Sequence, residues 1–204
     1  MSELGRFADL KKFTTESAHA MMVRERIQLK TPIAAPETAS VPVVLAELES
    51  GKAKDHVLDI LHLMAHGLPK REATWWACLA GRDLYPKEQS VDPLTLSTAE
   101  AWVYKPSDKT RSDARTAMEN AMPGDKTKLC ALAATFAPGT LGPGDLEDYE
   151  APPGAVGAAV FGMVLRSLYL DPVRIGPKGE MLIERGLDIA RGGNGRVEPV
   201  AATG

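Results

Sequence analysis

Apolar side chains recur every three or four residues along most of this chain, which is the spacing of one face of an α-helix. The clearest case is the stretch PKREATWWACLA, from Pro69 to Ala80, in which Ala73, Trp76 and Ala77 fall on one face. Runs that alternate apolar and polar residues, as β-strands do, are few. The pattern therefore predicts an all-α protein.

The same spacing predicts seven or eight main helices, in either a compact bundle or a short stack of helical hairpins. Pro69 suits a first helical turn, and Gly81 can close the same helix in the left-handed conformation. Ser107 and Asp125 can each cap a following helix with a side-chain oxygen. The predicted ranges are 43–49, 53–66, 69–80, 93–105, 107–122, 125–136, 154–170 and 177–191.

Composition divides the chain into three parts. Residues 1–40 contain a predicted amphipathic helix, from Ala8 to Leu29, followed by a Pro/Ala/Thr-rich linker. Residues 41–192 form the predicted helical domain, and residues 193–204 are predicted to be a disordered tail. The pattern leaves open whether the first part packs on the domain or forms an arm.

Two adjacent tryptophans, Trp75 and Trp76, stand out in a chain with 5% aromatic residues. Neighbouring helical residues point about 100° apart, so the two indoles meet different surroundings. Trp76 belongs to the alanine-lined face, and we expect it in a common core with Trp102 or Phe161, its helix packing on the glycine-rich segment 154–170. Trp75 lies beside that face, where it either meets a second core helix or anchors a partner protein.

Charge and hydropathy narrow the class of partner. The chain carries 24 Lys and Arg against 27 Asp and Glu, a net charge of -3, which does not favour nucleic acid or an anionic membrane. The longest apolar run stops at Arg166, too short for a membrane span, and the N-terminus lacks the apolar core of a signal peptide. We expect a cytoplasmic protein in which Cys78 and Cys130 are buried free thiols.

One group of metal-ligand residue types occurs in the predicted helix 53–66. Asp55, Asp59, His62 and His66 follow one another at spacings of four, three and four, on a single helix face. Apolar residues cover the opposite arc, so we expect this stripe to be solvated. The four span about 16 Å, too far for one ion. A metal site would therefore be restricted to His62, His66 and Asp59, as in a small metal-dependent enzyme.

Other chemical motifs are missing or unspecific. The chain has no glycine-rich phosphate loop and no serine or cysteine nucleophile motif, so we predict no catalytic residue and no cofactor. The segment from Gly142 to Gly154, here called the acidic connector, is expected to be a solvated loop, a protein-recognition loop or a catalytic carboxylate pair. Its carboxylates are Asp145, Glu147, Asp148 and Glu150.

Four stretches carry a resemblance to a known family: LPKREATWWACLA, AEAWVYKPSDKTRSDA, APGTLGPGDLEDYEAPPGAVGAAVFGMVL and MLIERGLDIARGG. Together they resemble a bacterial all-helical family of unknown function, some members of which are encoded near type VI secretion genes. The resemblance covers most of the chain after the linker and implies a cytoplasmic accessory or adaptor role. Its motifs mark helix packing, and it assigns no catalytic residue.

These observations favour a non-catalytic adaptor that binds another protein, with the metal-dependent enzyme as the alternative. Arg71 lies one helical turn from Trp75 on the same side of the helix, and Arg and Trp are enriched at binding hot spots. We expect Arg71, Trp75 and the four carboxylates of the acidic connector to form the partner-binding surface, without nucleic acid or membrane insertion.

Overall fold

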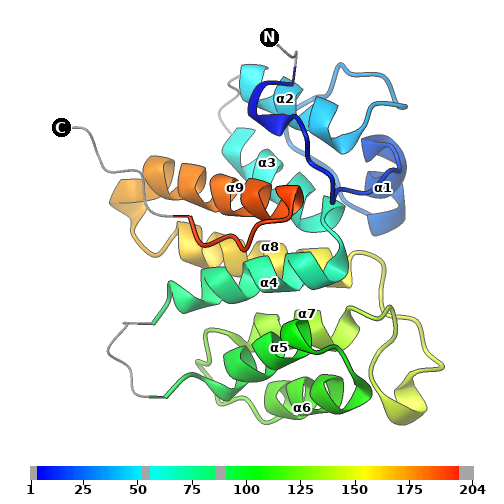
Figure 1. Cartoon of the computed structure of the whole chain (residues 1–204), viewed down its shortest axis with the longest axis vertical. Helices are drawn as coiled ribbons and strands as arrows, with labels where there is room; N and C mark the ends of the chain where they lie inside the picture. Colours follow the sequence, from blue (N-terminus) through cyan, green and yellow to red (C-terminus); the bar gives the residue numbers. More distant parts are fainter. Residues whose placement is uncertain (1–3, 52–55, 86–90, 198–204) are drawn as a thin grey trace.

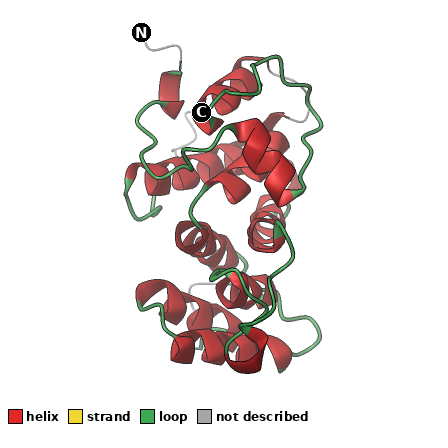
Figure 2. Ribbon diagram, turned by 90° about the vertical axis from the view of Figure 1, so that its right-hand side faces the viewer, coloured by secondary structure: helices red, strands yellow, loops and turns green. Residues whose placement is uncertain are grey.

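A computed structural model describes residues 4–51, 56–85 and 91–197 of the chain. Within these ranges the chain forms nine α-helices and three short 3₁₀ helices, with no strand, which confirms the all-α prediction (Figure 2). The helices are α1 (Ala18–Glu25), α2 (Val41–Gly51), α3 (His56–Gly67), α4 (Lys70–Arg82), α5 (Leu94–Tyr104), α6 (Asp108–Glu119), α7 (Lys128–Phe136), α8 (Ala155–Leu168) and α9 (Ile175–Arg191), and the 3₁₀ helices are η1 (Gly5–Phe7), η2 (Gly144–Leu146) and η3 (Pro172–Arg174).

The helices form a compact bundle around two central helices, α4 and α8, which pack extensively on each other. On one side this pair meets α5 and α7, and α6 packs on both from outside (Figure 1). On the other side it meets α3 and α9, with α1 and α2 packed on α3. The expected pairing of the Trp-bearing helix with the glycine-rich helix is therefore confirmed.

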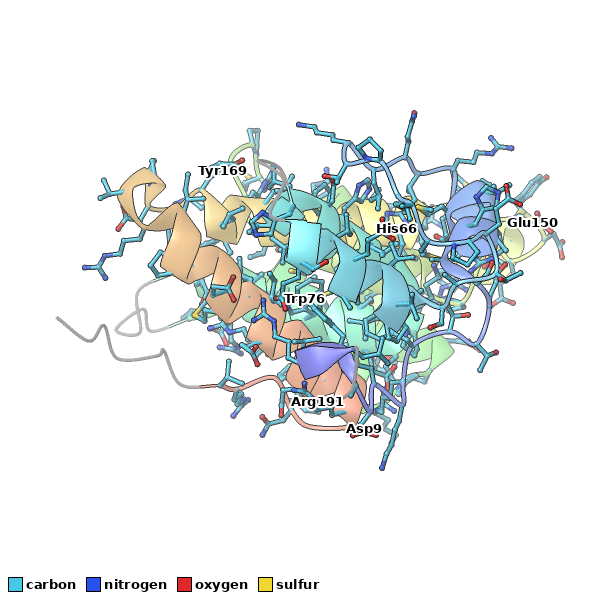
Figure 3. All side chains as sticks on the ribbon, turned by 90° about the horizontal axis from the view of Figure 1, so that it is seen from above. Asp9, His66, Trp76, Glu150, Tyr169 and Arg191 are labelled. Carbon is cyan, nitrogen blue, oxygen red and sulfur yellow. The ribbon has the colours of Figure 1, made fainter. Side chains whose placement is uncertain are left out.

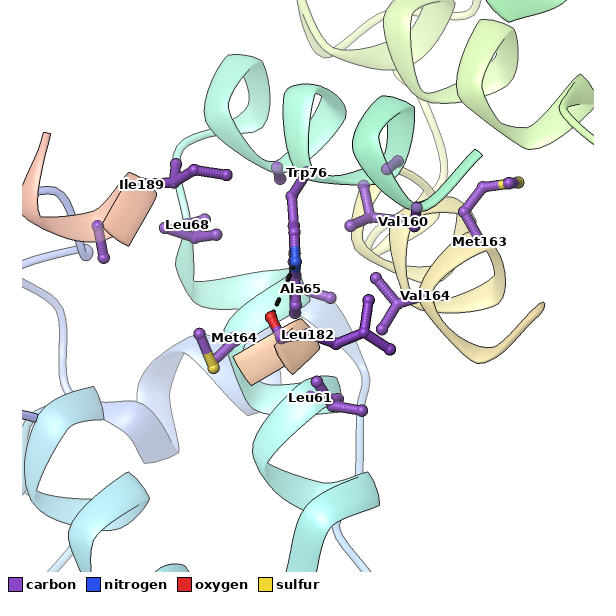
Figure 4. Packing of buried hydrophobic residues seen from close by; sticks show 14 of the residues in the cluster. Leu61, Met64, Ala65, Leu68, Trp76, Val160, Met163, Val164, Leu182 and Ile189 are labelled. Carbon is purple, nitrogen blue, oxygen red and sulfur yellow. Dashed lines mark hydrogen bonds between the residues drawn. The ribbon is translucent and has the colours of Figure 1, made fainter. Parts of the chain in front are cut away.

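Trp76 lies at the centre of this packing. Its side chain is fully buried among Leu61, Met64 and Val160, and its indole Nε1 donates a hydrogen bond of 3.2 Å to the backbone oxygen of Leu182 (Figure 4). Trp102 belongs to the same buried cluster, as the sequence predicted. Because the indole N–H has a partner, this large side chain is buried without leaving a donor unpaired.

Helix ends agree with the sequence at one place and differ at another. The Ser107 side chain caps the first turn of α6 as predicted, in a capping box with Thr110. The predicted left-handed closure at Gly81 is wrong, because α4 continues through it to Arg82. A Cβ on Gly81 would lie 3.2 Å from Cys130 Sγ, so the glycine here allows α4 and α7 to approach closely.

Residues 4–40 pack on the domain and do not form a free arm. Phe7, Phe13 and Met21 are buried in the common core, although only residues 18–25 of the predicted 8–29 helix are helical. The helix ends at Arg26, which has a left-handed φ of 55°. Phe13 lies against Gly67, where a Cβ would be only 2.9 Å from the phenyl ring. Separate apolar anchors, and not one amphipathic helix, therefore attach the N-terminal segment.

The two tryptophans are expected to differ in their contribution to stability. Trp76→Ala removes a fully buried indole and should cost about 3–5 kcal/mol of unfolding free energy, whereas Trp75→Ala, at a partly exposed site, should cost less. Urea unfolding of both variants measures the difference. Equal and small losses would contradict the central position of Trp76.

Candidate functional site

Arg71 and Trp75 lie on the same side of α4, against the last turn of α5. The Arg71 Nε donates a hydrogen bond of 2.6 Å to the backbone oxygen of Val103. The Trp75 and Tyr104 rings lie with their centroids 5.5 Å apart, and Tyr104 is 63% exposed. We call Arg71, Trp75 and Tyr104 the Trp75 face. Sequence reasoning missed Tyr104, because helical spacing within α4 carries no information on which α5 residue lies beside it.

The C-terminal segment covers part of the Trp75 face. Trp75 Nε1 donates a hydrogen bond of 2.7 Å to the backbone oxygen of Asn194, and the Arg196 guanidinium lies 5.8 Å from the indole centroid. The prediction of disorder from residue 193 onward therefore does not hold for residues 193–197. The cause is local: Gly192 ends α9 in a left-handed conformation, and Asp188 accepts a hydrogen bond from Gly195 N, which directs the chain along α4.

Arg111 of α6 attaches the acidic connector to the bundle. The buried Arg111 guanidinium donates to the backbone oxygens of Thr135 and Thr140 at 2.8 and 3.0 Å, and it lies 3.7 Å from Glu147. The predicted carboxylates Asp145, Glu147, Asp148 and Glu150 are all exposed. Figure 3 shows Glu150 at the periphery of the molecule.

The connector and the beginning of α4 lie on the same side of the molecule (Figure 1). Among the described residues, however, no hydrogen bond or ion pair joins the connector to Arg71 or Trp75. The structure thus brings Arg71 and Trp75 together and leaves the four carboxylates as a separate surface.

The predicted solvation of the Asp/His stripe on α3 is wrong. Asp59 and His66 are each 3% exposed, because the N-terminal segment packs over them. Both Asp59 carboxylate oxygens are engaged, accepting hydrogen bonds of 3.0 Å from Lys30 N and 2.8 Å from Thr31 N. Asp55 lies outside the described residues.

His62 is packed as an aromatic side chain. Its ring stacks on Phe161 of α8 with centroids 4.3 Å apart, and it meets the His66 ring edge-on at 5.2 Å. Burial, together with the nearby His66, lowers the pKa of His62 to about 4, although Asp59 acts in the opposite direction. His62 is therefore neutral at pH 7. Within the described ranges, no three His, Cys, Asp or Glu side chains are placed to share a metal ion.

A buried ionic cluster around Glu25 was not foreseen from the sequence. Lys70 Nζ donates to the two Glu25 carboxylate oxygens at 2.9 and 3.0 Å, and His66 Nδ1 lies 3.3 Å from Oε2. Burial opposes ionisation, but the hydrogen bonds from His66 and Lys70 and the charges of Lys70 and Arg24 outweigh it and lower the pKa of Glu25 to about 2. An ionised carboxylate only accepts, so His66 Nδ1 carries the donated proton.

This Glu–His pair lies between helices with almost no exposed surface. The His66 side chain is 1% exposed, and its ring lies directly against α8. A Cβ on Gly157 would be 2.3 Å from His66 Nδ1, and one on Gly154 would be 2.3 Å from the backbone oxygen of Glu25. The two glycines therefore permit α1, α3 and α8 to meet at one point, and the ionic cluster joins them there.

The site and the fold define a class: an all-α bundle whose buried ionisable side chains join helices, with an Arg, Trp and Tyr cluster at its surface. Among the described residues, no single helix has both the length and the apolar character needed to cross a membrane. The chain belongs to DUF6931, a family of unknown function, whose sequence model matches residues 45–190. No curated protein and no solved structure matches the chain.

The contact between α8 and His66 predicts a stability difference between two glycines. Gly157→Ala should cost about 1–3 kcal/mol, because the new Cβ overlaps a buried ring. Gly162→Ala is the matched control: its Cβ meets only the flexible end of Leu129, at 2.8 Å, and helix propensity favours alanine by up to about 1 kcal/mol. Thermal and urea unfolding compare the two. Equal effects would contradict the packing described.

The Glu25 cluster predicts a pH-dependent stability. The pKa of Glu25 falls from 4.5 to about 2 on folding, so the ionised carboxylate stabilises the fold above pH 4.5 and loses this effect as the pH falls toward 2. Glu25→Gln should therefore cost on the order of 3 kcal/mol at pH 7, with the deficit shrinking below pH 4.5. Glu16→Gln, which removes a surface partner of Arg24, should cost under about 1 kcal/mol. Urea unfolding across this pH range measures both, and a deficit independent of pH would overturn the assignment.

Proposed function

We propose that this protein is a non-catalytic helical adaptor that binds another protein through the Trp75 face and the acidic connector. The observation that carries the proposal is the gathering of Arg71, Trp75 and Tyr104 at one surface. These three residue types are enriched among hot spots, because they offer large contact areas and directional hydrogen bonds. The hydrogen bond from Arg71 to Val103 fixes the face between two packed helices, so it is preorganised for binding.

The acidic connector supplies the second part of the surface. Its attachment through Arg111 and Glu147 holds the loop in place, while Asp145, Asp148 and Glu150 remain exposed with no ion-pair partner among the described residues. Loops held on a rigid scaffold commonly carry recognition residues. Three unpaired carboxylates favour a partner with a basic surface, whose approach they accelerate at low ionic strength.

The buried polar groups support a binding role over catalysis. Asp59 holds the backbone of the N-terminal segment, His62 stacks on Phe161, and His66 is enclosed between Glu25 and α8. Asp59, His62 and His66, the three candidate metal ligands, are thus engaged in hydrogen bonds or ring packing within the fold. Among the residues that the structure describes, no three His, Cys, Asp or Glu side chains are placed to share a metal ion.

The sequence resemblance supplies the setting of the proposal. We place the adaptor in the bacterial cytoplasm, linked to a type VI secretion system. What supports this setting is the resemblance of the helix-packing motifs, including the Trp-bearing helix. A bacterial two-hybrid screen restricted to the products of adjacent genes tests the setting independently of the surface.

Substitution of the Trp75 face should abolish partner capture without unfolding the protein. Arg71→Ala combined with Trp75→Ala removes both anchors from α4, and Tyr104→Ala removes the exposed ring beside them. Loss of hot-spot side chains typically costs at least about 2 kcal/mol of binding, or more than tenfold in affinity. Co-purification from the native host, followed by quantitative binding to the recovered partner, measures the effect.

Lys109→Ala combined with Asp113→Ala is the matched control, because it removes an exposed pair on α6, away from the Trp75 face. This control should capture the partner as the wild type does. Circular dichroism and unfolding curves establish that all variants are folded. Undiminished capture by a folded Arg71/Trp75 double variant would refute the proposed surface, and metal-dependent turnover of a substrate would transfer the function to the enzyme class.

A further inference from the structure

The Trp75 face already has an occupant in this structure, namely residues 194–196 of the same chain, here called the strap. The strap leaves the end of α9 and lies on α4, where Asn194 O accepts the hydrogen bond from Trp75 Nε1 at 2.7 Å. The next residue, Gly195, donates its N–H to Asp188 Oδ2 at 2.8 Å. Arg196 then places its guanidinium over the indole, 5.8 Å from the ring centroid.

The position of Gly195 is specific for glycine. The residue is buried and has a φ of 70°, which side-chain-bearing residues rarely adopt. A Cβ at this position would lie 2.7 Å from Leu79 Cδ1 and 2.8 Å from Ile189 Cδ1. The surface beside Trp75 is therefore a slot that accepts a glycine backbone, with an arginine position directly after it.

Few interactions hold the strap. Apart from the helix-ending hydrogen bonds of Gly192 and Gly193 and the packing of Gly195 on Leu79 and Ile189, the described part of the chain holds the strap by two hydrogen bonds, to Trp75 and Asp188, and by the cation–π contact of Arg196. Among the described residues, the Arg196 guanidinium has no hydrogen bond and no ion pair, so its contact with the ring is unsupported by a carboxylate. A segment with the same backbone and the same cation can thus replace the strap without breaking a network.

We propose that the slot beside Trp75 is a peptide-binding site, that the strap occupies it in cis, and that the protein partner enters it with a Gly-Arg segment whose glycine has the same left-handed conformation. This inference deepens the proposed adaptor function and rests on it for the existence of a partner. The strap then competes with that partner, because both need the Trp75 indole and the Gly195 slot. The apparent affinity for the partner is therefore the intrinsic affinity multiplied by the fraction of molecules in which the strap has left the slot.

The indole N–H of Trp75 reports directly on the slot in ¹H–¹⁵N spectra of the full-length protein. Gly195→Val should release the strap, since the new side chain overlaps Leu79 and Ile189 and is disfavoured at this φ. Arg196→Ala is a milder second variant that removes only the cation. In both, the Trp75 indole signal should shift and exchange faster with water. The signal of buried Trp76, bonded to Leu182, should stay in place and shows that the core is intact.

The capped peptide GGNGRV, with the sequence of residues 192–197, is the probe. Added to the Gly195→Val protein, it should return the Trp75 signal toward its wild-type position, and the same peptide with alanine for arginine should bind at least about fivefold more weakly. The wild-type protein should bind the peptide about tenfold or more weakly than the variant, because a tethered strap competes at a millimolar effective concentration.

Three results would overturn the inference: no movement of the Trp75 signal, equal binding of the alanine peptide, or equal binding by wild type and both strap variants. A wild-type dimer that Gly195→Val dissociates, seen by sedimentation equilibrium, would instead show that the strap docks on a second copy. The titration needs no natural partner. If the peptide fails while Tyr104→Ala still abolishes capture, only this inference falls. If the peptide binds but substitutions in the Trp75 face leave partner capture unchanged, the proposed adaptor function is refuted and the peptide-binding slot is retained.

Discussion

The close contact between α8 and the His66 ring is the constraint on which the described architecture depends. Gly157 leaves room for that ring, and the ring in turn hydrogen-bonds Glu25, which Lys70 also holds. One point therefore joins α1, α3, α4 and α8. Because Glu25 is ionised and nearly fully enclosed, removing one of its partners leaves a buried charge with fewer hydrogen bonds, which lowers the stability of the fold.

This arrangement also engages the polar side chains of α3. His66 is enclosed between α1 and α8, and Asp59 has both oxygens occupied by backbone donors. The same helices that enclose them give α4 a fixed position, so that Trp75 is held at the surface while its neighbour Trp76 fills the core. Adjacent residues thus serve separate purposes, as the angle of about 100° between them on a helix allows.

The sequence predicted most of the helices and the burial of Trp76, because helical spacing and local capping are properties of short segments. It could not predict that the polar face of α3 is covered, since periodicity identifies which face is polar but not what lies against it. Phe7 and Phe13 reach the core from a segment that lacks a continuous helical pattern. Tyr104 and Arg196 meet Trp75 across long sequence separations. Such contacts depend on the tertiary arrangement of several elements, and the spacing of residues within one element does not predict that arrangement.

The family match covers the Trp75 face but not the whole of the Glu25 cluster. The matched residues, 45–190, include Arg71, Trp75 and Tyr104, but they leave out both Glu25 and the strap. The Glu25 cluster attaches a segment outside the match to the matched bundle, whereas the residues of the proposed binding surface all lie inside the match. The strap, residues 194–196, lies outside the match, so the proposed covering of the Trp75 face is a feature of this chain that the family model does not include.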